Sequence, residues 1–183
     1  MAEKYLNKYR ISSTRLSTWD YSCNGAYFIT ICTVNRQHYF GEIINAEMHL
    51  SEIGELANQF WLAIPDHSPF VLLDAFVVMP NHMHGIIVID KPNNNRGDKQ
   101  EPETQQPKQL HPRFRNQGKN TISAMIGSFK SAVTKYCNEN KLPFGWQPRF
   151  HDHIIKENDE FHRIRNYILN NPANWNDDKF FSV

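Results

Sequence analysis

The hydrophobic residues of the chain fall into short runs and longer helical stripes that alternate along the sequence. The runs at 26–34 (AYFITICTV) and 70–79 (FVLLDAFVVM) are rich in β-branched and aromatic residues, and their length is typical of buried strands. A third run, HMHGIIVID at 82–90, follows the turn dipeptide Pro80-Asn81. This arrangement predicts an antiparallel hairpin with two histidines at the start of its returning strand.

Three helices are predicted from apolar residues at helical spacing and from signals at the helix ends. Ser51 is a suitable N-cap for a helix that stops at Pro65. A second helix carries an apolar stripe from Ile122 to Tyr136. A third runs from about Asp159, a good N-cap, to Asn171, because the next residue is proline.

The remaining segments complete a predicted α+β fold. Residues 38–54 contain short apolar bursts typical of a small hairpin, and a last strand is expected at about 151–156. The order strand, helix, strand, strand, helix, strand, helix fits a ferredoxin-like βαββαβ sandwich with an antiparallel sheet and an extra C-terminal helix. Residues 1–183 are predicted to form a single domain, with a Pro/Asn/Gln-rich loop insertion at about 91–120.

Composition excludes several protein classes. Hydrophobic residues make up 40% and charged residues 21% of the chain, which argues against wholesale disorder. No apolar run approaches the roughly 20 residues of a membrane span, and the first residues lack a signal peptide's apolar stretch. We therefore expect a cytoplasmic protein with no membrane partner. The three cysteines are widely spaced and are expected to be reduced thiols.

The histidine pair is the first candidate for chemistry. Side chains alternate across a strand, so His82 and His84 point to the same face, about 7 Å apart. Both faces of this strand are otherwise apolar, which predicts a central strand that is covered on both sides. Two neutral imidazoles can bind a metal ion if a third ligand comes from elsewhere. Hydrogen-bonded core histidines would explain a bare His-x-His pair equally well.

The last helix offers a nucleophile. If Phe161, Ile164 and Ile168 form its buried stripe, Tyr167 lies at the edge of that stripe and Asn171 lies on the same side. The alternative is an ordinary amphipathic tyrosine with a buried ring and a solvated hydroxyl. A phenol with a pKa near ~10 is a weak nucleophile at neutral pH. A metal ion on the histidines would help by polarising a phosphodiester oxygen.

Four segments, in order, resemble one known family. VVMPNHMHGIIVI (77–89) resembles the HUH motif of single-tyrosine DNA transposases, and WQPRFHDHIIKENDEFHRIRNYILNNP (146–172) resembles the tyrosine-helix region of the REP-associated tyrosine transposases. YFITICTVNRQHYFGEI (27–43) and IGSFKSAVTKYCN (126–138) resemble the first strand and second helix of that family. The resemblance implies a ferredoxin-like fold, His82 and His84 as ligands of Mg²⁺ or Mn²⁺, and Tyr167 as the nucleophile.

The third metal ligand is left open. In related insertion-sequence transposases a glutamine four residues after the tyrosine completes the metal site, and this chain has the shorter Asn171 there. His153, on the predicted last strand, is the alternative ligand. Imidazoles also suit Zn²⁺ or Mn²⁺, so the residues do not identify the physiological metal.

Candidate DNA-binding residues lie in segments that combine cations with aromatic rings. Between residues 105 and 144 there are seven cations and one anion, Glu139, although a solvated basic face would have the same composition. HPRFRNQGK and WQPRF interleave cations with rings, as single-strand binders do, while Trp146 and Phe150 could equally be core residues. The cations predicted to contact DNA are Arg10, Arg15, Arg113, Arg115, Lys130 and Arg149.

The sequence therefore predicts a metal-dependent endonuclease or transposase that acts on single-stranded DNA. By the resemblance, it would cut and rejoin strands near hairpin-forming palindromic repeats through a 5′-phosphotyrosine intermediate. Two alternatives remain: a non-catalytic nucleic-acid-binding module on the same fold, and a two-histidine hydrolase unrelated to DNA, which the lack of clustered carboxylate ligands disfavours. The sequence leaves open whether the protein is a monomer or a homodimer.

Overall fold

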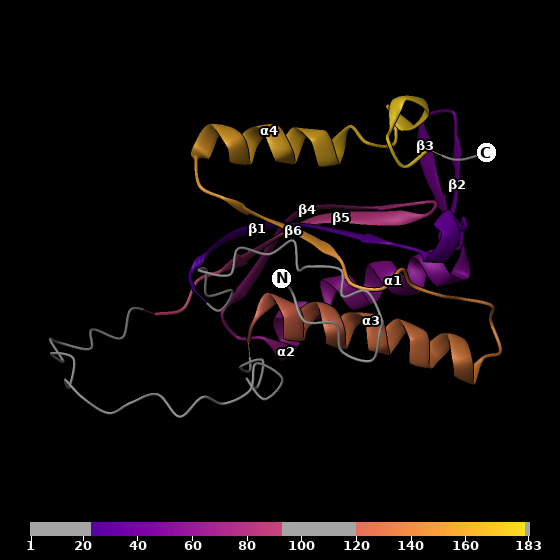
Figure 1. The fold of residues 1–183 in the computed structure, drawn as a ribbon, viewed down its shortest axis with the longest axis horizontal. Coiled ribbons are helices and arrows are strands. Elements are labelled where there is room, and N and C mark those ends of the chain that lie inside the picture. The colour runs from indigo at the N-terminus through magenta and orange to yellow at the C-terminus, as the bar shows by residue number, and fades with distance from the viewer. Residues whose placement is uncertain (1–22, 93–119, 182–183) are drawn as a thin grey trace, which may run out of the picture.

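The computed structural model describes residues 23–92 and 120–181. The described chain alternates strands and helices in nearly the predicted order (Figure 1). Its elements are β1 (Gly25–Cys32), the 3₁₀ turn η2 (Val34–Arg36), β2 (Gly41–Ile44), β3 (Glu47–Leu50), α1 (Glu52–Leu62), α2 (Ile64–His67), β4 (Val71–Met79), β5 (His82–Ile89), α3 (Ile122–Glu139), β6 (His151–Ile155), α4 (Asn158–Leu169) and the 3₁₀ turn η4 (Trp175–Asp177).

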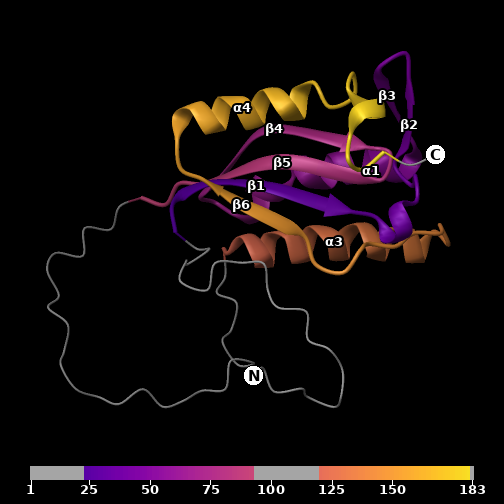
Figure 2. The ribbon, with the colours of Figure 1, turned by 45° about the horizontal axis from the view of Figure 1, so that its top comes forward.

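The main sheet has four antiparallel strands in the order β4-β5-β1-β6. β2 and β3 form a separate two-stranded sheet, which is the small hairpin expected between the first strand and the first helix. Helix α4 covers one face of the main sheet, and α1 and α3 cover the other (Figures 1 and 2). A mixed α+β fold with an antiparallel sheet is thus confirmed. None of the described helices is both long enough and apolar enough to cross a membrane.

β5 lies inside the sheet and is buried on both faces, as its apolar alternation predicts. Met83 and Ile87 point into the larger core, which is shared with α1 and α3. Ile86 points the other way and packs against Ile168 of α4. Because side chains alternate, His82 and His84 lie on the α4 face of the sheet.

The helix ends differ slightly from the predictions. Ser51 is the N-cap of α1 and accepts a hydrogen bond from the Gly54 amide at 3.1 Å, as expected. However, α1 ends at Leu62, and Pro65 lies in the first turn of α2, where its missing N–H costs nothing. Helix α4 ends at Leu169, so Asn171 lies just beyond the helix rather than within it.

Gly85 is required for the packing of α1 on the sheet. A Cβ atom on Gly85 would lie 2.4 Å from Cζ2 of Trp61 and 3.1 Å from Cβ of Phe76. The Trp61 ring is 1% exposed and also packs edge-on against Phe129, with ring centroids 5.5 Å apart. The ring therefore has little room to move away from an added methyl group.

We expect Gly85→Ala to lower the free energy of unfolding by about 1 to 3 kcal/mol, because it overpacks this contact. Gly127→Ala is the matched control, since a Cβ at this exposed position in α3 meets nothing within 4 Å. That substitution should raise the free energy of unfolding by roughly 0.5 to 1 kcal/mol. Urea denaturation of both variants tests the pair, and equal effects would contradict the packing argument.

Candidate active site

The two histidines lie where β5 begins, directly after the two-residue turn that joins it to β4. The register pairs Met79 with His82, so the turn consists of Pro80 and Asn81, as predicted. His82 and His84 are 0% and 1% exposed. They are buried polar groups in an apolar sheet, and each therefore needs partners for its ring nitrogens.

The tautomer of His82 follows from its hydrogen bonds. The Asn81 Nδ2 amide donates to the Phe180 carbonyl oxygen at 2.9 Å, which turns its Oδ1 atom toward His82. The His82 Nδ1–H therefore donates to Asn81 Oδ1 at 2.8 Å. The Nε2 atom must then carry a lone pair, and it is buried without a hydrogen-bond partner.

His84 is oriented by a neighbour across the sheet. Thr30 is its register partner on β1, and Thr30 Oγ1 lies 2.9 Å from His84 Nδ1. The imidazole stacks on the ring of Phe28, with centroids 5.2 Å apart. The other nitrogen, Nε2, lies 3.2 Å from the Tyr167 hydroxyl. The same chain therefore supplies both the histidines and the tyrosine.

Asp178 completes the group, and sequence reasoning missed it. Its Oδ1 accepts from the Phe180 amide at 2.6 Å, and its Oδ2 accepts from Asn171 Nδ2 at 2.9 Å and from the Tyr167 hydroxyl at 3.2 Å. The two acidic residues after Trp175 and Asn176 were the available signal. They lie outside any periodic segment, so no sequence pattern indicated that they would lie near the histidines.

The alternatives for a third ligand lie in different places. Asn171 is 2% exposed, and its Oδ1 atom is buried without a hydrogen-bond partner. His153 lies on β6 and binds Glu160, with Nε2 2.8 Å from Oε1, so it does not belong to this group. The structure therefore brings Asn171 to the site and leaves His153 outside it.

Burial controls the protonation of the histidines. The pKa of His82 is lowered to about 3, mainly by burial and next by the positive charge of Arg36, while the Asn171 side chain acts in the opposite direction. Burial also holds the pKa of His84 well below its usual range. Both imidazoles are therefore neutral at neutral pH, as metal ligands must be.

The environment of Tyr167 raises the pKa of its hydroxyl, whereas the pKa values of the two histidines are lowered. Burial raises the pKa of Tyr167 to about 12, with further contributions from the charge of Asp178 and from the hydrogen bond to it. Tyr167 nevertheless remains 41% exposed, so solvent or a substrate can reach its side chain. In the structure the residue is a protonated phenol beside a carboxylate.

These residues fit a divalent cation. One ligand atom from each of His82, His84 and Asp178 can be chosen so that all lie within 4.8 Å of one another. Two neutral imidazoles and one carboxylate suit Mn²⁺, Zn²⁺ or Fe²⁺, and the added oxygen makes the set more favourable for Mg²⁺ than histidines alone. The buried lone pairs of His82 Nε2 and Asn171 Oδ1 lack any partner that the described residues supply. This group can hold a metal ion.

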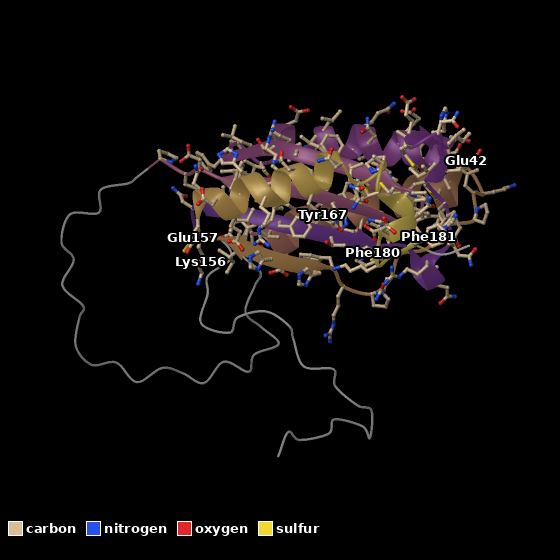
Figure 3. All side chains as sticks on the ribbon, turned by 90° about the horizontal axis from the view of Figure 1, so that it is seen from above. Glu42, Lys156, Glu157, Tyr167, Phe180 and Phe181 are labelled. Carbon is tan, nitrogen blue, oxygen red and sulfur yellow. The ribbon has the colours of Figure 1, made fainter. Side chains whose placement is uncertain are left out.

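The segment after α4 covers the histidines. The Phe180 ring lies over His82, with centroids 4.5 Å apart, and 5.6 Å from the His84 ring. The ring of Trp175 also stacks on the His82 ring, with centroids 6.0 Å apart. Figure 3 shows the side chains of Tyr167, Phe180 and Phe181 on one face of the molecule.

Two of the six predicted DNA-binding cations, Lys130 and Arg149, lie among the residues that the structure describes. Arg10, Arg15, Arg113 and Arg115 lie outside the described residues. Lys130 donates to the carbonyl oxygens of Gln147 and Arg149 at 2.9 and 2.8 Å, so it braces the loop before β6. The side chain of Arg149 is exposed on that loop. Contacts of these cations with DNA stay a prediction.

The rings near that loop belong to the core. Trp146 is partly buried, donates from Nε1 to the Lys130 carbonyl oxygen at 3.1 Å, and packs against Phe40, with centroids 5.5 Å apart. Phe150 also packs against the main core. Both rings are thus partly buried against the core, which agrees with the core interpretation in part.

Comparisons with known proteins agree with the fold. No family model matches the chain. A protein of Haemophilus influenzae, described only as uncharacterized, is 38% identical over 170 residues, which cover 92% of each chain. A solved structure of a REP-associated tyrosine transposase bound to a REP hairpin is 21% identical, with a TM-score of 0.59, over 90% of this chain and 74% of that one. The chain therefore belongs to one family with the Haemophilus influenzae protein, and it has the fold of a REP-associated tyrosine transposase.

Proposed function

We propose that this protein is a metal-dependent endonuclease and strand transferase that acts on single-stranded DNA through Tyr167. The observation that carries the proposal is the convergence of two buried neutral histidines and one carboxylate, whose ligand atoms lie within 4.8 Å of one another, with an accessible phenol 3.2 Å from His84 and from Asp178. His82, His84 and Asp178 would hold the metal, with Asn171 as a further oxygen donor, and Mg²⁺ or Mn²⁺ is the proposed ion.

The chemistry follows from the positions of the protein groups. A divalent cation bound there would polarise a phosphodiester oxygen as a Lewis acid. Tyr167 would attack the phosphorus, forming an O–P bond while the bond to the 3′ oxygen breaks. Asp178 Oδ2, 3.2 Å from the phenol oxygen, would accept the phenol proton, and the leaving 3′ oxygen would take a proton from solvent, so that the products are a 5′-phosphotyrosine and a 3′-hydroxyl. Attack by another 3′-hydroxyl on the phosphotyrosine would rejoin strands.

Two features support this reaction over simple binding. Neutral ligands and one carboxylate leave a site with a bound divalent cation at net +1, which complements the single negative charge of a phosphodiester. In addition, Asn81 and Thr30 each fix a histidine ring through Nδ1, which is the usual way in which proteins orient metal-binding imidazoles. A histidine that only fills the core would also need a partner for Nε2, whereas the buried Nε2 of His82 has none among the described residues.

The proposal extends to substrate and fold class. The transposase of similar fold was solved with a REP hairpin, and this supports hairpin DNA with single-stranded flanks as the substrate class. The strand order β4-β5-β1-β6 supports classification as a ferredoxin-like βαββαβ sandwich with an added helix α4, and the whole chain as a single HUH transposase-like domain. His84 and Tyr167 of one chain lie 3.2 Å apart, which supports a reaction carried out within one protomer.

The role of Tyr167 can be tested by trapping the covalent product. With Mn²⁺ and a labelled pool of DNA hairpins whose single-stranded flanks are randomised, we expect a DNA adduct that survives denaturing electrophoresis. Tyr167→Phe should reduce the adduct to background, because it removes the nucleophilic oxygen, while DNA affinity changes by no more than about twofold.

Tyr136→Phe is the matched control, since this phenol lies on α3, exposed, and donates to Glu52 at 3.2 Å. It should leave the adduct unchanged. An adduct that persists in Tyr167→Phe would refute the assignment of the nucleophile. Binding of the hairpins without any adduct in the unsubstituted protein would favour the non-catalytic binding module.

The metal ligands can be tested without DNA. Mn²⁺ at a hundred times its dissociation constant should stabilise the protein by about 2.7 kcal/mol, seen as a rise in melting temperature. Asp178→Asn should weaken Mn²⁺ affinity in calorimetry by at least about tenfold, because it removes the only charged ligand. His82→Ala should abolish tight binding.

Asp177→Asn provides the matched control, because this neighbouring carboxylate is exposed and does not belong to the group. Its Mn²⁺ affinity should equal that of the unsubstituted protein. Asn171→Ala measures the contribution of the amide oxygen separately. If Asp178→Asn leaves the affinity unchanged and Asn171→Ala lowers it, the third ligand is the amide predicted from the sequence.

A further inference from the structure

A cluster of cations and aromatic rings borders the candidate metal site on the side away from α4. Arg36 lies at the end of η2, and Lys179 lies in the segment that follows η4. Both cations lie over the Phe180 ring, with Arg36 Cζ 4.3 Å and Lys179 Nζ 4.8 Å from its centroid. Phe180 in turn contacts His82, so the ring that both cations contact also lies against the candidate metal site.

Neither Arg36 nor Lys179 is paired with a carboxylate from the part of the chain that the structure describes. Arg36 is only half exposed, and a partly buried, unpaired guanidinium is costly unless an anion joins it. The nearby carboxylate of Asp178 is already used by the Phe180 amide, Asn171 and Tyr167.

The backbone holds Arg36 in this position at some cost. Asn35 and Arg36 both have positive φ, 51° and 58°, which is uncommon for a residue such as arginine. Thr33 anchors the turn, because its hydroxyl and its amide both bind the Asn81 carbonyl oxygen at 2.9 Å. The turn that presents Arg36 is thus tied to the residue that orients His82.

An exposed aromatic ring, Phe181, follows Phe180 in the chain. Phe181 is 40% exposed, and its ring contacts Trp175 edge-on with centroids 5.4 Å apart. Figure 3 shows Phe181 beyond Phe180 as seen from Tyr167. An exposed ring beside unpaired cations is the combination with which proteins bind single strands, because bases stack on the ring and phosphates meet the cations.

We propose that Arg36, Lys179 and Phe181 form a single-strand contact surface that holds the DNA flank next to the phosphate cut by Tyr167. This surface deepens the proposed function and rests on it. The two cations bind backbone phosphates adjacent to the scissile one, and Phe181 stacks on a base. The occupant is single-stranded DNA rather than duplex, because separate bases are needed to reach a ring that lies against the protein surface.

The test measures binding and cleavage in the full chain. The probes are a labelled oligothymidylate of about 20 nucleotides and a blunt DNA hairpin without flanks. The double variant Arg36→Gln with Lys179→Gln should bind the oligothymidylate at least about tenfold more weakly, and the slope of log affinity against log salt should fall by about 1.4. Phe181→Ala should weaken binding by about tenfold, with no change in that slope.

Matched controls separate this effect from a general loss of charge or structure. Lys135→Gln with Lys141→Gln removes two exposed cations, one on α3 and one two residues beyond its end, so oligothymidylate binding should be unchanged. The Arg36→Lys variant, with Lys179 retained, should keep most of the affinity, because it restores the charge. Mn²⁺ affinity should not fall in the double variant, because removing two cations beside the metal site does not weaken its attraction for a divalent ion.

Each result decides between the hypotheses. Equal losses on the blunt hairpin and on the oligothymidylate would overturn the single-strand assignment, and so would losses in the Lys135 and Lys141 control. Normal Tyr167 adducts and normal oligothymidylate binding in the double variant would overturn this inference while leaving the proposed function intact. Selective loss of oligothymidylate binding, with no adduct from the unsubstituted protein, would support the surface and refute the endonuclease.

Discussion

The buried carboxamide of Asn81 is the group on which the rest of the site depends. Through one side chain and one carbonyl it binds three separate parts of the chain: the ring of His82, the backbone of Phe180 and the turn that begins at Thr33. Its Oδ1 must accept from His82 because its amide donates to a carbonyl oxygen. Because the Nδ1–H of His82 donates to Asn81, the lone pair of His82 Nε2 is buried and directed away from Asn81, toward the other candidate ligands.

The other site residues are positioned by the pairing of strands in the main sheet and by the alternation of their side chains. Cross-strand pairing places Thr30 beside His84, and alternation places both histidines on the face that α4 covers. Burial then keeps the histidines neutral, whereas the half-buried Tyr167 and the charged Asp178 share a proton-donating contact at the border with solvent. Neutral histidines and an accessible phenol, the proposed ligands and nucleophile, therefore arise from one gradient of burial across a few residues.

Much of this could be predicted from local patterns. Strand alternation, the Pro80-Asn81 turn and the helical stripes are local signals, and they give the order of elements, the shared face of the histidines and the position of Tyr167. Asp178, Asn81 and Arg36 could not be recognised as site residues. Asn81 and Phe180 are 99 residues apart along the chain, and Asp178 lies in a short polar segment without periodicity, so only the tertiary fold brings them together.

The position of Asp178 also changes how the motif should be understood. A His-x-His pair with an amide ligand carries no charge of its own, and it would bind a hard divalent cation weakly. A carboxylate at the same site supplies that charge, but it also raises the pKa of the adjacent Tyr167, which disfavours the phenolate. The Asp178 carboxylate would therefore strengthen metal binding while it disfavours ionisation of the proposed nucleophile, Tyr167. A cation bound to Asp178 would relieve this opposition, since its charge would offset the carboxylate at the position where the phenol must lose its proton.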